Sequence, residues 1–229
     1  MKCLMVVDMQ RCFIRDTNKY LIDEVNRLIH SGLFDKIIYT QFIGDNNSGF
    51  VKISNWHGGQ TKEEIEIVVD IIPNSIVLKQ QATYGLPPKD FVTLREEGIE
   101  EVYICGTDID ACVYAICLNL YDNCFKPIIV TDACDTSSSN LTIKQNTLEI
   151  MRRNFGPTCM CSSTEIYNEL YKELSTSPTY KAWVDHKQKY KHLKPGKSQL
   201  ETGEYLKPAS DEEIAHTKRQ TLNTENELD

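Results

Sequence analysis

Three side chains in this sequence combine chemical reactivity with a position where functional groups gather in many folds. Asp8, Lys79 and Cys112 each come after a short apolar run that is typical of a buried strand. In parallel α/β sheets the functional groups gather at the carboxyl ends of the strands, where loops meet helix N-termini. We therefore expect these three side chains to meet at one edge of a sheet.

Cys112 gains most from its position, because it falls in the first turn of a predicted helix. A helix N-terminus and a nearby cation lower the pKa of a thiol, and the thiolate is the nucleophile. Lys79 could supply the cation, and Asp8 could take the thiol proton and later return it to a leaving group. Backbone N–H groups at the start of the helix could hold an oxyanion. The alternative is an inert core thiol, with Asp8 as a turn residue and Lys79 in solvent.

The elements that must position these groups alternate along the first 174 residues. Apolar and β-branched runs predict strands at residues 3–7, 37–40, 75–78, 101–105, 127–131 and 158–161. Apolar residues at helical spacing predict helices at 19–30, 90–97, 111–123, 140–154 and 164–174. Continuous apolar strands separated by helices indicate a parallel sheet that is covered on both faces. The predicted fold class is α/β, a three-layer α/β/α sandwich.

The composition favours a soluble intracellular protein that binds neither nucleic acid nor membrane. The formal net charge of −8 argues against a nucleic-acid partner, because phosphate contacts need clustered Lys and Arg. No run approaches the roughly 20 apolar residues of a membrane span, and the N-terminus lacks the pattern of a secretory signal. Nine cysteines without a signal indicate reduced thiols. We expect a soluble, cytoplasmic protein with no membrane partner.

The composition changes near residue 175, so we place one domain at residues 1–174 and a C-terminal extension at 175–229. Residues 180–193 could form a helix anchored by Trp183 and Tyr190, whose spacing puts them on one helical face. After Pro195 the chain is polar and cannot bury enough apolar area to offset its ordering entropy. The extension is therefore predicted to hold one helix and then disorder.

Three segments of the chain, VVDMQ, VLKQQATYG and CGTDIDACVYAICLNLYDNCFKPIIVTDAC, resemble the isochorismatase-like cysteine hydrolases. This superfamily includes nicotinamidases and carbamoyl amidases, and the likeness covers about residues 1–174. The resemblance implies a six-stranded, mainly parallel sheet and a catalytic triad of Asp8, Lys79 and Cys112. It also implies a non-proline cis peptide at Thr107–Asp108 and an oxyanion hole made by the backbone N–H groups of Asp108 and Cys112. Relatives are usually oligomers, which implies a homo-oligomer.

The departures from this resemblance bear on the cofactor and the pocket. Metal-dependent nicotinamidases carry an Asp-Trp-His signature after the second strand and a further histidine, whereas the stretch YTQFIGDNNSGF has no histidine. We therefore expect no catalytic metal and no cofactor, with His57 as a surface or hydrogen-bonded residue. Ile109 stands where many relatives have threonine. The residues that lie where relatives line the substrate pocket are Gln10, Gln41, Phe50 and Trp56. Core packing is the alternative for the two aromatic residues.

The retained cysteine indicates the type of reaction. True isochorismatases cleave a vinyl ether and often lack this cysteine, so Cys112 favours acyl chemistry on a C–N bond. We expect hydrolysis of a small amide or carbamoyl substrate through a thioester, in a small and partly apolar pocket. The alternatives are a catalytically silent binding or scaffold protein on the same fold, or a vinyl ether hydrolase. A redox protein is a further alternative, although no second cysteine is placed in the sequence to resolve Cys112.

Overall fold

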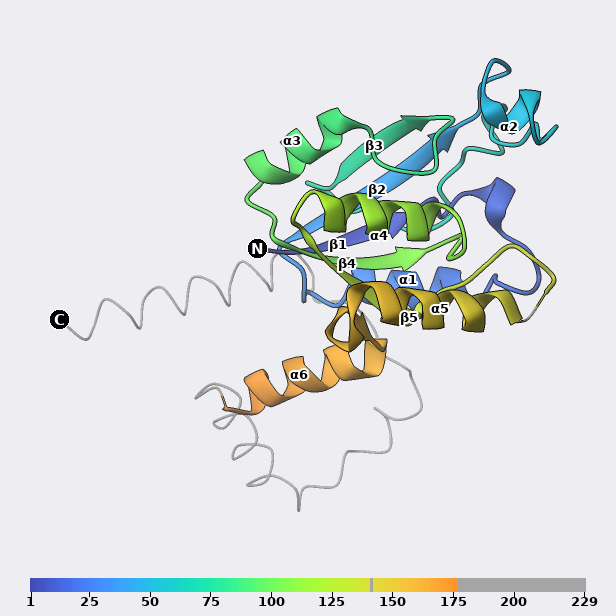
Figure 1. Ribbon diagram of the computed structural model, residues 1–229. Helices are drawn as coiled ribbons and strands as arrows, with labels where there is room; N and C mark the ends of the chain where they lie inside the picture. Colours follow the sequence, from blue (N-terminus) through green and yellow to red (C-terminus); the bar gives the residue numbers. More distant parts are fainter. Residues whose placement is uncertain (141, 177–229) are drawn as a thin grey trace, which may run out of the picture. The chain divides into compact units, whose positions relative to one another are not determined.

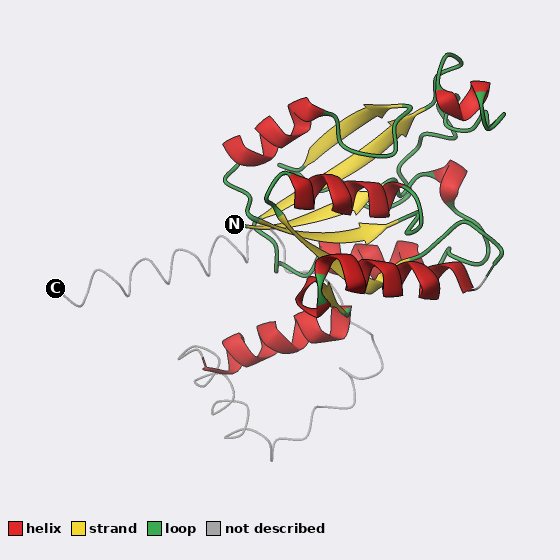
Figure 2. Cartoon of the chain, viewed as in Figure 1, coloured by secondary structure: helices red, strands yellow, loops and turns green. Residues whose placement is uncertain are grey.

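The computed structural model describes residues 1–140 and 142–176, and its elements alternate between strand and helix (Figure 1; Figure 2). The predicted helix at 180–193, with Trp183 and Tyr190, lies outside the described residues, as does the predicted disorder beyond it. The boundary at residue 174 and the extension therefore stay predictions.

Six parallel strands form one sheet in the order β3-β2-β1-β4-β5-β6, which confirms the predicted fold class. The strands are β1 (Lys2–Val7), β2 (Lys36–Ile43), β3 (Ile76–Gln81), β4 (Glu101–Gly106), β5 (Lys126–Cys134) and β6 (Met160–Cys161). The chain builds outward from β1 to β3 and then returns to place β4 on the other side of β1. The carboxyl ends of β1 and β4 therefore lie at a topological switch point, where ligands bind in open α/β sheets.

Helices cover both faces of this sheet and complete the three layers (Figure 1). The main helices are α1 (Leu21–Ile29), α3 (Pro88–Glu96), α4 (Cys112–Asp122), α5 (Thr142–Phe155) and α6 (Ser163–Thr176). One buried cluster contains Leu94 of α3, Ile116 of α4 and Met151 of α5. The other contains Val25 of α1 and Ile166 of α6. The sheet thus has two apolar faces, as its continuous hydrophobic strands require.

Three short helices were not predicted: η1 (Arg11–Phe13), α2 (Gly49–Lys52) and η2 (Pro157–Cys159). Two of them, η1 and α2, follow β1 and β2 directly in the chain. They therefore belong to the loops at the carboxyl edge of the sheet, where the candidate site lies.

The edge strand β3 runs further than the sequence predicts, and this affects the site. It ends at Gln81, three residues beyond the predicted end. Leu78 and Gln80 are buried, whereas Val77 and Lys79 are exposed, because successive strand side chains point to opposite faces. Lys79 therefore lies inside the strand and not in the loop that follows it.

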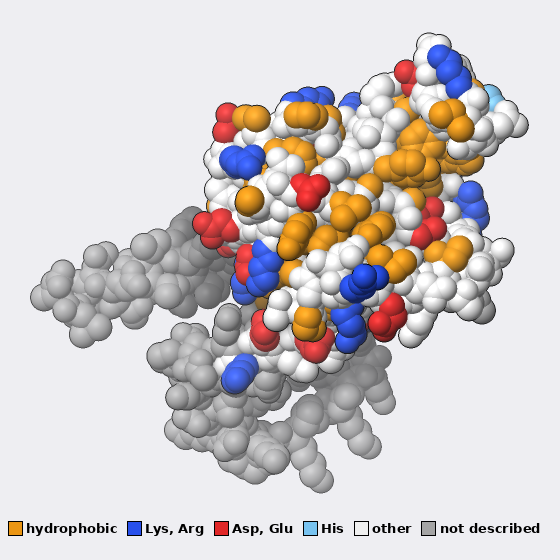
Figure 3. Space-filling model, viewed as in Figure 1, with side chains coloured by type: hydrophobic (Ala, Val, Ile, Leu, Met, Phe, Trp, Pro, Cys, Tyr) orange, Lys and Arg blue, Asp and Glu red, His pale blue; other side chains and the backbone are white. Residues whose placement is uncertain are grey.

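The face of the molecule seen in Figure 3 carries hydrophobic side chains over α4 and next to α2. Leu118 and Tyr121 of α4 are among the exposed large hydrophobic residues, although the other side of this helix is buried against the sheet. None of the described helices combines the length and the apolar character that a bilayer crossing requires.

Candidate active site

Asp8 lies directly after β1 and is completely buried. Its φ of 45° is in the left-handed region, which Asp tolerates better than most residues, and it turns the chain out of the strand. The Thr40 hydroxyl of β2 donates a hydrogen bond to Oδ1 at 2.6 Å and accepts one from the Asp8 backbone N–H at 3.1 Å. Within the described residues, Oδ2 has no hydrogen-bond partner. Burial raises the pKa of Asp8 from 3.8 to about 6, and contacts with Thr40 and the Cys112 thiol limit this rise.

Cys112 is the first residue of α4 and is only 4% exposed. Burial raises the pKa of its thiol well above the ordinary value, and the neighbouring carboxyl groups of Asp8 and Asp108 raise it further. The expectation of a lowered pKa is wrong, because desolvation and two acidic neighbours outweigh the helix N-terminus. The resting thiol is therefore neutral and is coupled to a buried carboxyl group that can accept its proton.

The structure does not bring Lys79 to Asp8 and Cys112. Lys79 pairs with Gln41 in the register of β2 and β3, and it is exposed on the sheet face opposite to that of Leu78. Leu78 belongs to the same buried cluster as Cys112, so the two faces are distinct. Since β3 continues past Lys79 and no contact of this side chain with Asp8 or Cys112 is found among the described residues, its role as the cation stays a prediction.

The buried polar side chain of β3 is Gln80, the next residue along the strand. It is completely buried, and neither Oε1 nor Nε2 has a hydrogen-bond partner in the described part of the chain. A buried amide left without partners costs roughly 1–3 kcal/mol. By strand alternation Gln80 lies on the face of Leu78, so the polar group that β3 turns toward the Cys112 side of the sheet is an amide.

The loop before α4 contains a cis peptide between Thr107 and Asp108, at the position expected. The Asp108 carboxylate accepts hydrogen bonds from the Ser137 backbone N–H and hydroxyl, both at 2.6 Å, and from the Thr107 hydroxyl. Burial raises the pKa of Asp108 in spite of these hydrogen bonds. Among the described residues, the backbone N–H groups of Asp108 and Cys112 donate to no other part of the chain.

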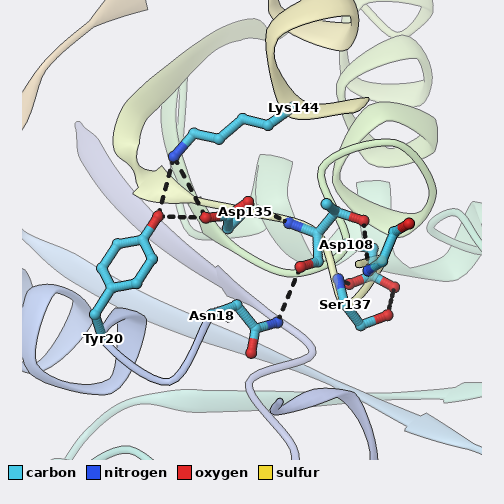
Figure 4. Close-up of polar contacts among 8 residues, drawn as sticks. Asn18, Tyr20, Asp108, Asp135, Ser137 and Lys144 are labelled. Atoms are coloured by element: carbon cyan, nitrogen blue, oxygen red, sulfur yellow. Dashed lines mark hydrogen bonds and ion pairs between the residues drawn. The ribbon is translucent and has the colours of Figure 1, made fainter. Parts of the chain in front are cut away.

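A network around Asp135 holds this loop in place (Figure 4). The Asp135 backbone donates to the Gly106 carbonyl at 3.2 Å and accepts from the Ile109 N–H at 2.9 Å, so it brackets the cis peptide. Its carboxylate accepts a hydrogen bond from the Tyr20 hydroxyl and lies 3.7 Å from Lys144 Nζ. These contacts connect the loop before α4 to α5 and to the segment before α1.

A cavity of about 190 Å³ opens over Cys112. Its walls include the aromatic rings of Phe13, Phe50, Trp56 and Tyr84. The Phe13 and Trp56 rings stack with centroids 5.8 Å apart, and the Phe50 and Tyr84 centroids are 4.6 Å apart. Phe50 and Trp56 therefore line the cavity as expected, and the cavity suits a small substrate with an apolar or planar part.

The polar lining of the cavity comes from segments that are far apart in the chain. It includes Arg15, Asp108 and Ser137, together with Cys12 and Cys112. Burial raises the pKa of the Cys12 thiol to about 12, with a further contribution from the charge of Asp8. The cavity is thus lined by a second thiol besides Cys112, which the sequence did not reveal.

Gln10 and Gln41 hold a loop in place and do not line the cavity. Gln10 Nε2 donates to the carbonyl groups of Phe42 at 3.0 Å and Ile65 at 3.1 Å, and its Oε1 accepts from the Phe42 N–H at 2.8 Å. Gln41 Nε2 donates to the same Ile65 carbonyl at 2.9 Å. Backbone hydrogen bonds between residues 9–12 and 64–68 strengthen this attachment. The two amides therefore have a structural role instead of the predicted pocket role.

Several site residues escaped the sequence reasoning, among them Thr40, Cys12, Phe13, Tyr84 and Ser137. Thr40 carried a usable signal, because it ends a predicted strand beside the one that Asp8 follows. Phe13 and Tyr84 carried none, since their meeting depends on contacts between loops that are distant in sequence.

The residues around Cys112 do not fit a catalytic metal. His57 is exposed, its Nε2 is 3.3 Å from Asn55 Oδ1, and it is not among the residues that line the cavity. No group of three or more His, Cys, Asp and Glu in residues 1–140 and 142–176 could hold a metal ion. Independence from metal stays a prediction, because it is a property of the reaction.

Comparisons with known proteins identify the family and solved structures with a similar fold. The Isochorismatase domain family matches residues 2–165. The pyrazinamidase of Pyrococcus horikoshii, solved in complex with zinc, is 23% identical with a TM-score of 0.59, over 67% of this chain and 96% of that one. The N-carbamoylsarcosine amidase of Thermoplasma acidophilum is 21% identical with a TM-score of 0.60, over 71% and 96%.

An isochorismatase-like hydrolase of Alkaliphilus metalliredigens is 14% identical with a TM-score of 0.61, over 74% of this chain and 98% of that one. At these identities the structural likeness concerns the fold alone. No curated protein sequence matches the chain. Since the family match covers well over half of the sequence, the chain belongs to the isochorismatase family.

Proposed function

We propose that this protein is a cysteine hydrolase that cleaves a C–N bond of a small amide or carbamoyl compound through a thioester on Cys112. Membership in the isochorismatase family supports a hydrolase. The observation that carries the finer proposal is the coupling of two buried groups, Asp8 and Cys112, beside a small aromatic cavity.

In the first half of the proposed reaction, ionised Asp8 takes the proton of the Cys112 thiol as the sulfur attacks the carbonyl carbon. The backbone N–H groups of Asp108 and Cys112 hold the resulting oxyanion, since neither donates elsewhere among the described residues. Protonated Asp8 then gives its proton to the nitrogen of the leaving group, which departs as ammonia or an amine.

In the second half, Asp8 removes a proton from a water molecule that attacks the thioester carbonyl carbon. The carbon–sulfur bond breaks, the acid product leaves, and the thiol regains its proton. A pKa of about 6 suits Asp8 to both directions of transfer, because it is mostly ionised near pH 7 yet still basic enough to accept a proton.

A panel of small amides and carbamoyl compounds, scored by ammonia release, tests this proposal. Wild type should turn over at least one member, and Cys112→Ala should be inactive while its thermal melt stays close to that of wild type. Cys124→Ala is the matched control, because that thiol is exposed and is not among the residues that line the cavity. Rapid denaturation during turnover should trap an acyl group on the Cys112 peptide by mass spectrometry.

The panel also separates the competing functions. A vinyl ether in the panel reports the alternative hydrolase, whose reaction would survive Cys112→Ala. No turnover of any compound, together with saturable binding of one of them, would favour a binding protein. The redox alternative is supported by the presence of Cys12 in the same cavity as Cys112. However, burial raises the pKa of both the Cys12 and the Cys112 thiols, which slows their oxidation.

A further inference from the structure

We propose that the substrate carries a carboxylate, and that the Arg15 guanidinium binds this carboxylate at the exposed side of the cavity over Cys112. This inference rests on the proposed function and deepens it, because it names the chemical class of the amide or carbamoyl compound. Arg15 is then a residue that determines specificity and takes no part in bond cleavage.

The first argument is the charge of the cavity lining. Among the described residues that line the cavity, Arg15 carries the positive charge and Asp108 the carboxyl group. The Asp108 carboxylate already accepts hydrogen bonds from Thr107 and Ser137. A ligand in the cavity therefore meets a carboxylate that protein donors satisfy and a cation that has charge to offer.

The second argument is that the Arg15 guanidinium keeps most of its donors free. Its Nη1 donates to the Ile14 carbonyl at 2.9 Å, and no carboxylate of residues 1–140 and 142–176 forms an ion pair with it. In the same segment, Arg11 uses both Nε and Nη2 on the Glu66 carboxylate. Neighbouring guanidinium N–H groups bind a carboxylate in a fork, which favours Arg for this task. Arg15 has its Nε and Nη2 available for such a contact.

The third argument is that a buried side chain fixes the backbone of Arg15 beside the cavity. Asn18 is completely buried, and its Oδ1 accepts a hydrogen bond from the Arg15 backbone N–H at 2.7 Å. Its Nδ2 donates to the carbonyl groups of Phe13 at 3.1 Å and Thr136 at 3.3 Å (Figure 4). Phe13 and Ser137, the residue after Thr136, also line the cavity. The backbone of Arg15 is therefore held in register with two other parts of the wall, which lowers the ordering cost of binding.

These positions describe a small molecule with three parts. Its amide or carbamoyl carbon lies at Cys112, and its middle part packs against the stacked rings of Phe13 and Trp56. Its carboxylate reaches Arg15, which is exposed. The ion pair formed there keeps contact with water, so it avoids most of the desolvation cost that a buried ion pair carries.

Pairs of compounds that differ in the acid group test this proposal by ammonia release. We would pair meta-carbamoylbenzoate with the neutral meta-acetylbenzamide, and N-carbamoylglycine with its methyl ester. In at least one pair, wild type should show a kcat/KM about tenfold higher for the acid. Arg15→Gln should make the two members equal, and Arg15→Lys should keep part of the preference, because an ammonium retains the charge without the fork.

Arg11→Gln is the matched control, because Arg11 is an exposed arginine of the same segment that pairs with Glu66 and does not line the cavity. This variant should keep the full preference for the acid. Thermal melts of all the arginine variants should stay close to that of wild type, since both side chains are exposed.

Calorimetric binding to the full-length Cys112→Ala protein separates this inference from the proposed function, because it needs no turnover. The acid of at least one pair should bind about tenfold more tightly than its neutral partner, and adding Arg15→Gln should remove the difference. Acids that bind through Arg15 but are never hydrolysed would refute the proposed function and support this inference. Equal binding within both pairs, or no binding of either acid at roughly millimolar concentration, would overturn it. A preference that survives Arg15→Gln and is lost in Arg11→Gln would overturn it as well.

Discussion

The Asp8 carboxyl group sets the pH dependence of the proposed reaction. It must be ionised to accept the thiol proton, and burial raises its pKa to about 6. We therefore predict that kcat/KM rises as the pH increases from 5 to 7, with an apparent pKa of about 6. Asp8→Asn should lower kcat by roughly 10³-fold or more, because an amide cannot accept this proton. Near-normal turnover in this variant would show that another group is the base.

The same group should make Asp8→Asn more stable than wild type at high pH. The folded-state pKa of about 6 exceeds the unfolded value of 3.8, so the folded protein holds this proton more tightly. The contribution of Asp8 to wild-type stability is therefore greatest below pH 4 and is lost as the pH rises through 6. At pH 8 the variant should gain about 2–3 kcal/mol in the free energy of unfolding, and at pH 4 the difference should vanish. Urea melts at both pH values measure this, and an equal difference at both would contradict it.

Thiol reactivity gives a third prediction at this scale. Cys112 is buried with a raised pKa, whereas Cys124 is exposed, so brief iodoacetamide treatment at pH 7 should label Cys124 first. Peptide mapping of the early products measures the order. Preferential labelling of Cys112 would mean that a cation reaches the thiol after all.

At the scale of elements, the segment after β2 builds the aromatic wall, and Gly58 sets the position of one ring. A Cβ atom at Gly58 would lie 2.3 Å from the Trp56 ring, so Gly58→Ala must displace this ring. We predict a rise in KM of about fivefold with little change in kcat, because an aromatic contact is worth about 1 kcal/mol. Gly49→Ala is the control, since its Cβ would meet only Ile53 Cδ1 at 3.7 Å. Similar kinetics for both variants would exclude Trp56 from binding.

The elements that the sequence predicts well are those whose environment is uniform along their length. β1 and β4 are buried on both faces, so their apolar runs mark them clearly, and the helices show their apolar spacing. The end of β3 was missed because an edge strand with polar residues resembles a loop. Asp8 and Cys112 were found because strand ends and helix starts are local features.

The aromatic wall could be predicted only in part, because it forms between loops. Phe50 and Trp56 came from the family resemblance, while Phe13 and Tyr84 join them through contacts that no local pattern encodes. Gln10 and Gln41 were assigned to the pocket, yet their amides bind the backbone of the loop. A polar side chain near a site can therefore stabilise a neighbouring loop and need not contact the substrate.

At the scale of the whole molecule, no group of three or more His, Cys, Asp and Glu among the described residues could hold a metal ion. We predict that dialysis against a chelator leaves ammonia release unchanged, since His57 is exposed and is not part of the cavity lining. The measurement compares treated enzyme with enzyme resupplied with zinc or iron. Activity that is lost to the chelator and restored by either ion would overturn this prediction.

A homo-oligomer also stays a prediction, which sedimentation or light scattering can check.

The attachment of residues 64–68 to residues 9–12 has a consequence for how this protein can diversify. Residues 44–63 carry Phe50, Ser54 and Trp56 of the cavity. This segment begins at the end of β2, and residues 64–68, which follow it, hydrogen-bond to residues 9–12. Asp8 and Cys112 belong to other parts of the chain and hold their geometry through Thr40 and α4. Insertions or replacements within residues 44–63 therefore alter which compounds fit the cavity, while Cys112 and Asp8 keep their positions. Natural selection can thus change the substrate preference without changing the reaction.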